Sequence, residues 1–233
     1  MDFDEGTFLQ RLDDVRGRIA AAAARSGRPA ERVTLVGVTK TVAVEAVQAA
    51  VALGLADLGE SRVQEAQAKI LAVGRDRARW HLIGHLQRNK AGRAVELFDR
   101  VHGVDDLDIA GALSRHAVSA GRSLPVLAEV NVSGEASKFG VAPEGLELLL
   151  ERIAALPGLR LDGLMTVGAP TERAEDARAG FARLRALRDR AEQRLGRSLP
   201  ELSMGMSGDF EVAVEEGGTM VRVGSAIFGE RRA

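Results

Sequence analysis

Residues 33–40 read VTLVGVTK, a short apolar run that ends in a lysine. Its length and its scarcity of charged residues predict a buried strand. Residues 45–53, EAVQAAVAL, then carry a helical pattern. Short apolar strands that alternate with helices are typical of parallel sheets in α/β proteins. This first strand–helix unit therefore predicts an α/β fold.

The same unit recurs along the chain after an N-terminal helix, which is marked by Phe8, Leu12, Val15 and Ile19 at helical spacing. The predicted strands are residues 33–40, 57–60, 80–84, 100–104, 124–132, 159–167, 201–205 and 220–225. Helical patterns lie between them at residues 45–53, 62–73, 89–98, 106–120, 143–156, 172–195 and 209–215. This order predicts a (β/α)8 TIM barrel, and an open doubly wound sheet is the alternative.

The length of 233 residues suits one barrel domain over residues 1–233, because such barrels commonly run about 200 to 250 residues undivided. Hydrophobic residues make up 45% of the chain, which is enough to form a core. The net charge is -1, so neither nucleic acid nor an anionic membrane is an expected partner. The acidic start MDFDEGTFLQRLDD is unlike a signal peptide, and no apolar run reaches the length of a membrane span. We therefore expect a cytoplasmic protein.

Lys40 closes the first predicted strand, and strand alternation places it on one face with Val36 and Val38. Desolvation penalises an unpaired ammonium and lowers the pKa of a buried amine. A neutral amine can attack an aldehyde carbon. The ordinary alternative is a lysine whose head reaches solvent at the strand end. Functional groups of barrels gather at this end of the strands, which favours a chemical role for Lys40.

Two turns near the C-terminus carry glycine and serine. The segment LSMGMSGDF, residues 202–210, places Gly205, Ser207 and Gly208 ahead of a predicted helix. The segment VRVGSAIFGE, residues 221–230, places Gly224 and Ser225 at the end of the last strand. Backbone N–H groups and hydroxyls in such turns bind phosphate, and phosphates in barrels frequently lie on the loops after strands seven and eight. Each turn alone also fits an ordinary glycine turn.

Arg222 alternates with Val221 and Val223, so its side chain is predicted to point away from theirs. A charged residue within an apolar strand needs a partner. The ring nitrogen of a pyridine cofactor is one such partner, and an arginine would keep that nitrogen unprotonated because it only donates hydrogen bonds. An ion pair at the bottom of the barrel or with a helix is the alternative.

The chain has four histidines, His81, His85, His102 and His116. His81 and His85 straddle a predicted strand end instead of sharing a helix, and no carboxylate cluster stands beside them, so we expect no metal site. The absence of cysteine excludes disulfides and thiolate ligands. The GHLQRNK loop is instead expected to line the barrel mouth with His85, Asn89 and Lys90. Lys138, in the GEASKFG loop after the fifth strand, is a second candidate cation for a phosphate or an aldehyde.

Seven segments in order give the chain a resemblance to a known family. They are VGVTKT, GESRVQEAQAK, WHLIGHLQRNK, NVSGEASKFG, GLMTVGAP, LSMGMSGDFEVAVEEG and VRVGSAIFGER. Together they resemble the pyridoxal phosphate homeostasis protein family, whose barrel is similar to the N-terminal domain of alanine racemase. The resemblance covers nearly the whole chain after the first helix.

The resemblance implies that pyridoxal 5′-phosphate (PLP) is held as a Schiff base on Lys40. It further implies a set of cofactor-binding residues: Ser207, Gly224 and Ser225 at the phosphate, Arg222 at the ring nitrogen, Lys138 in the SK-x-G loop, and Gly205, Met206 and Met165 in the matching segments. The chain departs from the family at Ser61, where an asparagine is usual. A direct contact from that position to the cofactor is therefore in doubt, and the shorter serine would reach it only through water.

Two functions are consistent with the resemblance. The first is a non-catalytic, monomeric protein that carries or buffers PLP. PLP-dependent apoenzymes are the partners to which it would deliver the cofactor. The second is a PLP-dependent, racemase-like enzyme. A two-base racemase similar to alanine racemase pairs its lysine with a tyrosine from a second domain, whereas this chain contains no tyrosine and leaves no room for that domain. The missing partner base favours the carrier.

Overall fold

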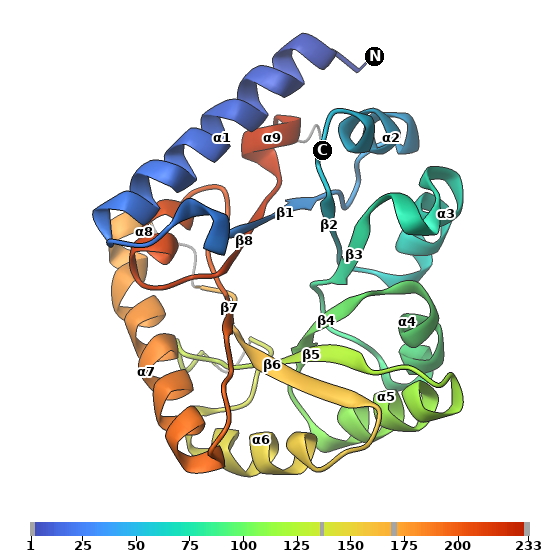
Figure 1. Ribbon diagram of the computed structural model, residues 1–233, viewed down its shortest axis with the longest axis vertical. Helices are drawn as coiled ribbons and strands as arrows, with labels where there is room; N and C mark the ends of the chain where they lie inside the picture. The colour runs from blue at the N-terminus through green and yellow to red at the C-terminus, as the bar shows by residue number, and fades with distance from the viewer. Residues whose placement is uncertain (1–2, 136–137, 169–171, 231–233) are drawn as a thin grey trace.

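Eight parallel strands form a closed barrel in the order β1 to β8, seen end-on in Figure 1. The computed structural model describes residues 3–135, 138–168 and 172–230. The strands are β1 (Thr34–Val38), β2 (Asp57–Glu60), β3 (Arg79–Leu82), β4 (Arg100–Val104), β5 (Leu124–Glu129), β6 (Leu159–Met165), β7 (Glu201–Ser203) and β8 (Met220–Val223). The closed order confirms the predicted (β/α)8 barrel and excludes the open sheet. Several strands end earlier than predicted, because the chain leaves the barrel there to form the loops of its mouth.

Helices surround the barrel (Figure 1). They are α1 (Glu5–Arg25), α2 (Val44–Ala52), α3 (Val63–Val73), α4 (Ala91–Leu97), α5 (Leu107–Ser119), α6 (Leu146–Ala154), α7 (Arg178–Leu195), α8 (Phe210–Glu215) and α9 (Ser225–Phe228). Short 3-10 turns precede α4, α6 and α7, at Arg88–Lys90, Pro143–Gly145 and Ala174–Ala177. The periodicity did not predict α9, because four residues are too few to show a helical repeat. In the described part of the chain no helix is both long and apolar enough to span a membrane.

Helix α1 precedes the first strand and packs along α8 and α9 (Figure 1). Asp4 caps its N-terminus by accepting a hydrogen bond from the Thr7 amide, and the predicted apolar side chains form its buried face. Arg18, on the side of α1 that faces α8, pairs with Glu211 of α8 at 2.9 Å. These contacts fix the helix that follows β7, whose preceding loop borders the barrel mouth.

Alternation along the strands separates two interiors. On β8, Val221 and Val223 join the large apolar core between strands and helices, whereas Arg222 does not belong to it. Met165, Leu127 and Met220 form a separate small apolar cluster. Buried polar side chains accompany them on the strands, including Asp57, His81, His102, Glu129 and Ser203. A lining this polar requires paired hydrogen bonds throughout, since an unpaired buried polar group is costly.

Candidate functional site

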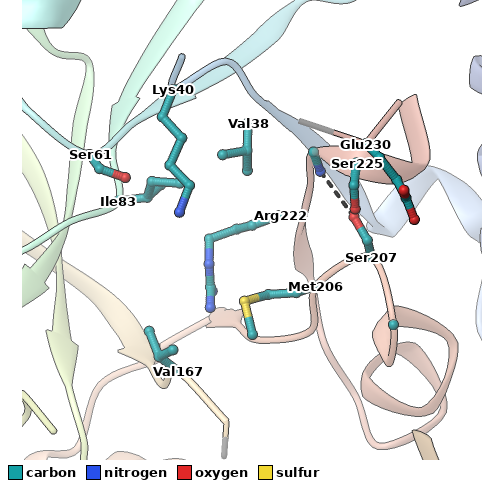
Figure 2. Close-up of a pocket in the computed structure, with 12 residues that line it drawn as sticks. Val38, Lys40, Ser61, Ile83, Val167, Met206, Ser207, Arg222, Ser225 and Glu230 are labelled. Atoms are coloured by element: carbon teal, nitrogen blue, oxygen red, sulfur yellow. Dashed lines mark hydrogen bonds between the residues drawn. The ribbon is translucent and has the colours of Figure 1, made fainter. Parts of the chain in front are cut away.

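A cavity of about 610 Å³ lies at the C-terminal ends of the strands. Its lining comes from the ends of β1, β2, β3, β6, β7 and β8 and the loops that follow them, and comprises Val38, Lys40, Ser61, Ile83, Val167, Met206, Ser207, Gly208, Arg222, Gly224, Ser225 and Glu230. Figure 2 shows Lys40 and Arg222 extending into it, with Ser207 and Ser225 on the other side. Six predicted cofactor residues thus share one cavity: Lys40, Met206, Ser207, Arg222, Gly224 and Ser225. Parallel strands bring them together because their C-terminal ends open on one face.

The turn that carries Lys40 is held on both sides of that residue. The Lys69 Nζ, buried on α3, donates to the Thr39 carbonyl oxygen at 2.5 Å. The Thr41 amide donates to Glu65 Oε1 at 2.6 Å. Thr41 has a φ of 65°, an uncommon left-handed conformation for a β-branched residue. These contacts stabilise a strained backbone next to Lys40, which is the kind of strain that functional sites retain.

Glu60, at the end of β2, completes this network. The Lys69 ammonium donates to Glu60 Oε1 at 2.8 Å and to Glu65 Oε1 at 2.9 Å, and the Thr39 hydroxyl donates to Glu60 at 2.6 Å. Burial raises the pKa of Glu60, and the hydrogen bonds from Lys69 and Thr39 offset only part of that rise. We refer to Glu60, Glu65 and Lys69 as the turn-holding triad. None of its members was singled out from the sequence, because their partners lie on three different elements.

Arg222 is almost fully buried and lines the cavity. Its guanidinium donates to the Ser203 hydroxyl at 2.6 Å and to the Thr166 carbonyl oxygen at 2.8 Å. Burial lowers its pKa to about 10, against the opposing charges of Glu129 and Asp209. Arg222 therefore stays cationic at neutral pH. It points into the barrel and away from the outer core of Val221 and Val223, as strand alternation predicts.

Two loops form the side of the cavity opposite Lys40 (Figure 2). Ser207 follows β7, and its hydroxyl oxygen accepts hydrogen bonds from the amides of Gly224 at 3.2 Å and Ala226 at 3.3 Å. Gly224 and Ser225 follow β8. Amides and hydroxyls that converge from two loops are groups that bind phosphate. They lie after strands seven and eight, where barrels frequently bind phosphate, and phosphate binding by these residues stays a prediction.

Gly205, Met165 and Lys138 do not line this cavity. Gly205 has a φ of +90°, and a Cβ there would lie 2.5 Å from the Ala213 Cβ, so this glycine permits α8 to pack closely. Met165 is fully buried in its apolar cluster. Lys138 lies 3.1 Å from Glu135 in an ion pair, and its neighbours at positions 136–137 fall outside the described residues. Direct contacts from these three residues to a cofactor remain predictions.

His85 lies outside the cavity, in a neighbouring hollow that Lys90 and Ser61 also line. Its ring stacks on Phe139, with ring centroids 4.1 Å apart. Asn89 is exposed and lines neither space. Within the described ranges, no three His, Asp or Glu side chains converge in a way that could hold a metal ion. His81 and His102 instead contact each other, Nδ1 to Nε2, at 2.9 Å.

Four lining residues were not predicted as part of the site: Val38, Ile83, Val167 and Glu230. Val38 shares a strand face with Lys40. Ile83 directly follows β3, and Val167 follows the end of β6 by two residues. Strand alternation and strand ends were therefore available as signals for these three. Glu230 had no such signal, because it lies past α9, the helix that the periodicity did not predict.

The sequence matches the alanine racemase N-terminal domain family model over residues 11–232. This chain belongs to that family. Among similar proteins, the pyridoxal phosphate homeostasis protein of Aquifex aeolicus is 42% identical over 223 residues, which are 96% of this chain and 98% of that protein. The one from Pseudomonas aeruginosa is 45% identical over 225 residues, which are 97% of this chain and 96% of that protein.

One solved structure that is similar to this chain contains a bound cofactor. PipY of Synechococcus elongatus, whose structure was determined with PLP bound, superimposes with a TM-score of 0.83 at 35% identity. The match covers 95% of this chain and 100% of PipY. These relatives confirm the family resemblance that the seven segments indicated.

The residues of the cavity fit PLP by their chemistry. PLP joins an aldehyde, a pyridine nitrogen and a phosphate, and the cavity offers an amine, a cationic donor and a group of amides and hydroxyls. Apolar side chains of Val38, Ile83 and Val167 add surface for the ring. Each part of the cofactor therefore finds a complementary group within one space.

Proposed function

We propose that this chain binds PLP in the cavity at the barrel mouth and serves PLP homeostasis, carrying or buffering the cofactor as a Schiff base on Lys40. The observation that carries the proposal is the convergence of Lys40, Arg222 and the loops after β7 and β8 on one cavity. The names of the Aquifex and Pseudomonas relatives and the PLP bound in PipY support it.

The residues would divide the work as follows. Bound PLP supplies an aldehyde carbon that a lysine amine can attack. The turn-holding triad fixes the backbone on both sides of Lys40. Arg222 donates hydrogen bonds toward the ring side of the cavity, and the Ser207 and Ser225 loops bind the phosphate.

The proposal places a non-catalytic role first. The relatives are named for homeostasis, which suggests such a role. The chain also contains no tyrosine to act as the second base of a racemase. We further propose that residues 1–233 act as one domain, as a monomer and in the cytoplasm, and that PLP-dependent apoenzymes receive the cofactor.

Borohydride reduction tests the attachment. After reduction with PLP, peptide mass mapping should find the label on Lys40. Lys40→Ala should lose both the label and the absorbance of the Schiff base, while some cofactor stays bound non-covalently. Lys90→Ala is the matched control, because Lys90 lines the neighbouring hollow instead. A label confined to Lys138 or Lys90 would overturn the assignment.

Delivery needs its own measurement. Loaded protein is mixed with several PLP-dependent apoenzymes, and the recovery of their activity is compared with the rate of spontaneous PLP release. Transfer faster than release supports direct delivery. Equal rates would restrict the protein to storage.

A further inference from the structure

A row of five polar side chains crosses the barrel interior from the cavity to the far end of β2. It runs from Arg222 through Ser203, His102 and His81 to Asp57, on strands β8, β7, β4, β3 and β2. Successive distances are 2.6 Å from the Arg222 guanidinium to the Ser203 Oγ, 2.8 Å from there to the His102 Nδ1, 2.9 Å from the His102 Nε2 to the His81 Nδ1, and 3.0 Å from the His81 Nε2 to Asp57 Oδ1. All five residues are less than a tenth exposed.

The chemistry of the two ends gives this row one direction. An arginine only donates, so the Ser203 oxygen accepts from Arg222 and its own proton is directed to the His102 Nδ1. Burial tends to raise the pKa of Asp57, but hydrogen bonds with His81 and Arg79 outweigh that effect and hold it below its ordinary value. Asp57 is therefore a carboxylate and an acceptor, and the His81 Nε2 carries a proton.

The two histidines between these ends connect them. Burial lowers the pKa of His102 well below its ordinary value, with His81 and Arg222 adding to the effect, so His102 is neutral. Because its Nδ1 accepts from Ser203, its proton is on Nε2 and is donated to the His81 Nδ1. Both rings are then neutral Nε2–H tautomers, and every bond of the row runs from guanidinium to carboxylate. The reverse direction would leave the Ser203 hydroxyl proton without its acceptor at His102, which is unfavourable in a buried site.

We infer that Ser203, His102 and His81 are positioning residues that fix the Arg222 guanidinium toward the cofactor ring, and that Asp57 anchors the row from the opposite end. The Thr166 carbonyl oxygen holds a second guanidinium nitrogen at 2.8 Å, so the fork cannot rotate without breaking two hydrogen bonds. The guanidinium retains further N–H donors for a ligand. The inference rests on the proposed binding of PLP at this cavity.

The tautomers can be measured without any cofactor. Nitrogen-15 NMR of the full-length PLP-free protein should show His81 and His102 as Nε2–H tautomers, each with an unprotonated Nδ1. In Ser203→Ala the His102 Nδ1 loses its donor, and its nitrogen signal should move while the fold is retained. An Nδ1–H tautomer at either histidine in the wild type would overturn the row's direction. Since PLP is absent, this outcome is independent of the proposed function.

Binding then tests the effect on Arg222. Ser203→Ala should weaken PLP binding roughly tenfold, the usual loss for a hydrogen bond to a charged group, and should shift the absorbance of the bound cofactor. Ser114→Ala is the matched control, because it also removes a buried serine hydroxyl bond, to the Pro157 carbonyl oxygen, but on α5. It should lower stability without moving PLP affinity or absorbance.

Asp57→Asn tests whether the whole row of hydrogen bonds orients Arg222, or whether Ser203 acts only by packing against it. Asp57 lies outside the cavity lining, so its replacement can affect the cofactor only through the row. It should weaken PLP binding about threefold or more, and its effect should not add to that of Ser203→Ala. Unchanged affinity in folded Ser203→Ala and Asp57→Asn would overturn the inference. Failure of the wild type to bind PLP would refute the proposed function instead.

Discussion

At the scale of single residues, Arg222 and Glu129 are two buried ionisable groups of opposite charge that affect each other's pKa. Arg222 is cationic at neutral pH, with its pKa at about 10. Glu129, on β5, is 5% exposed, and burial together with the negative charge of Asp105 raises its pKa to about 7, although Arg222 acts to lower it. Glu129 is thus the one of the pair whose charge changes in the physiological range. Its titration must then affect stability, because the folded and unfolded states bind protons differently.

The first prediction concerns Glu129→Gln. A carboxyl whose pKa rises from 4.5 to about 7 on folding contributes stability that is fully present below pH 4.5 and is lost as the pH rises through 7. The size is about 3 kcal/mol, from about 1.4 kcal/mol per pKa unit. Glutamine is neutral at every pH, so the variant should gain stability relative to the wild type by up to that amount between pH 5 and pH 8. Urea denaturation at several pH values measures the difference.

The control for this series is Glu45→Gln, which changes an exposed glutamate on α2. It should leave the pH dependence of the wild type unchanged. A constant free-energy difference between Glu129→Gln and the wild type across the pH range would show that Glu129 does not titrate there.

Sequence reasoning reached the residues whose signal is local. Lys40 closes a predicted apolar strand and Arg222 lies within one, so strand alternation predicted the direction of each side chain, and both line the cavity. Ser203, His102 and Lys69 gave no such signal. Their significance lies in hydrogen bonds to residues between 9 and 101 positions away, on other elements that the closed barrel brings together.

At the scale of elements, α3 holds the loop that follows β1. Lys69 is buried and reaches Thr39, Glu60 and Glu65 with one ammonium group. Removing one partner of a buried ion pair leaves the other charge uncompensated. The turn of Lys40 therefore depends on a helix that lies outside the cavity.

The second prediction follows for Lys69→Met, which keeps the side chain's length and removes its charge. It should destabilise the protein by about 3 kcal/mol or more, because the buried Glu60 carboxylate loses its cationic partner. Adding Glu60→Gln should restore part of the loss, so the two changes should be strongly non-additive in denaturation measurements. Lys90→Met, in the neighbouring hollow, should cost far less. Additive effects of Lys69→Met and Glu60→Gln would refute the coupling.

The third prediction concerns the loops after β7 and β8. Amides and hydroxyls that bind a phosphate dianion form charge-assisted hydrogen bonds worth roughly 1.5–3 kcal/mol each. PLP should therefore bind far more tightly than unphosphorylated pyridoxal in a direct titration. Ser207→Ala should narrow this preference by about tenfold or more, whereas Ser133→Ala, on the loop after β5, should not change it. Equal affinities for PLP and pyridoxal in the wild type would exclude phosphate binding by these loops.

The fold itself was predictable at this scale wherever an element has a full period. β2 and β4 have the predicted bounds, because each is a short segment between two helical patterns. The sequence did not predict the last helix or where some of the other helices begin. α9 is too short for a repeat, and the predicted helix at 89–98 begins with a 3-10 turn, Arg88–Lys90, before α4. Periodicity could not predict that the barrel closes, because an open doubly wound sheet has the same alternation of strands and helices.

At the scale of the whole molecule, barrel closure determines which bases can share the cavity. In the described part of the chain the lining includes one amine, Lys40, and one carboxylate, Glu230, but no histidine. His85 and Lys138 lie outside the lining. A racemase needs a base on each face of the bound substrate, to remove the α-proton and to return a proton. Proton transfer on the second face would therefore have to use Glu230 or a residue outside this lining.

The last prediction is that L- or D-alanine will perturb the absorbance of the PLP-loaded protein without racemising faster than with free PLP. Lys40 could serve one face once a substrate amine has displaced it, but Glu230, the carboxylate that could serve the other face, is exposed to water. In the proposed site Arg222 would donate to the ring nitrogen and keep it unprotonated, which would also make the ring a poorer electron sink. The assay combines α-proton exchange in deuterated water with chiral analysis, and Glu230→Gln serves as the matched variant. Saturable turnover that disappears in Lys40→Ala would establish an enzyme, and His85 and Lys138 would be the first residues to test as its second base.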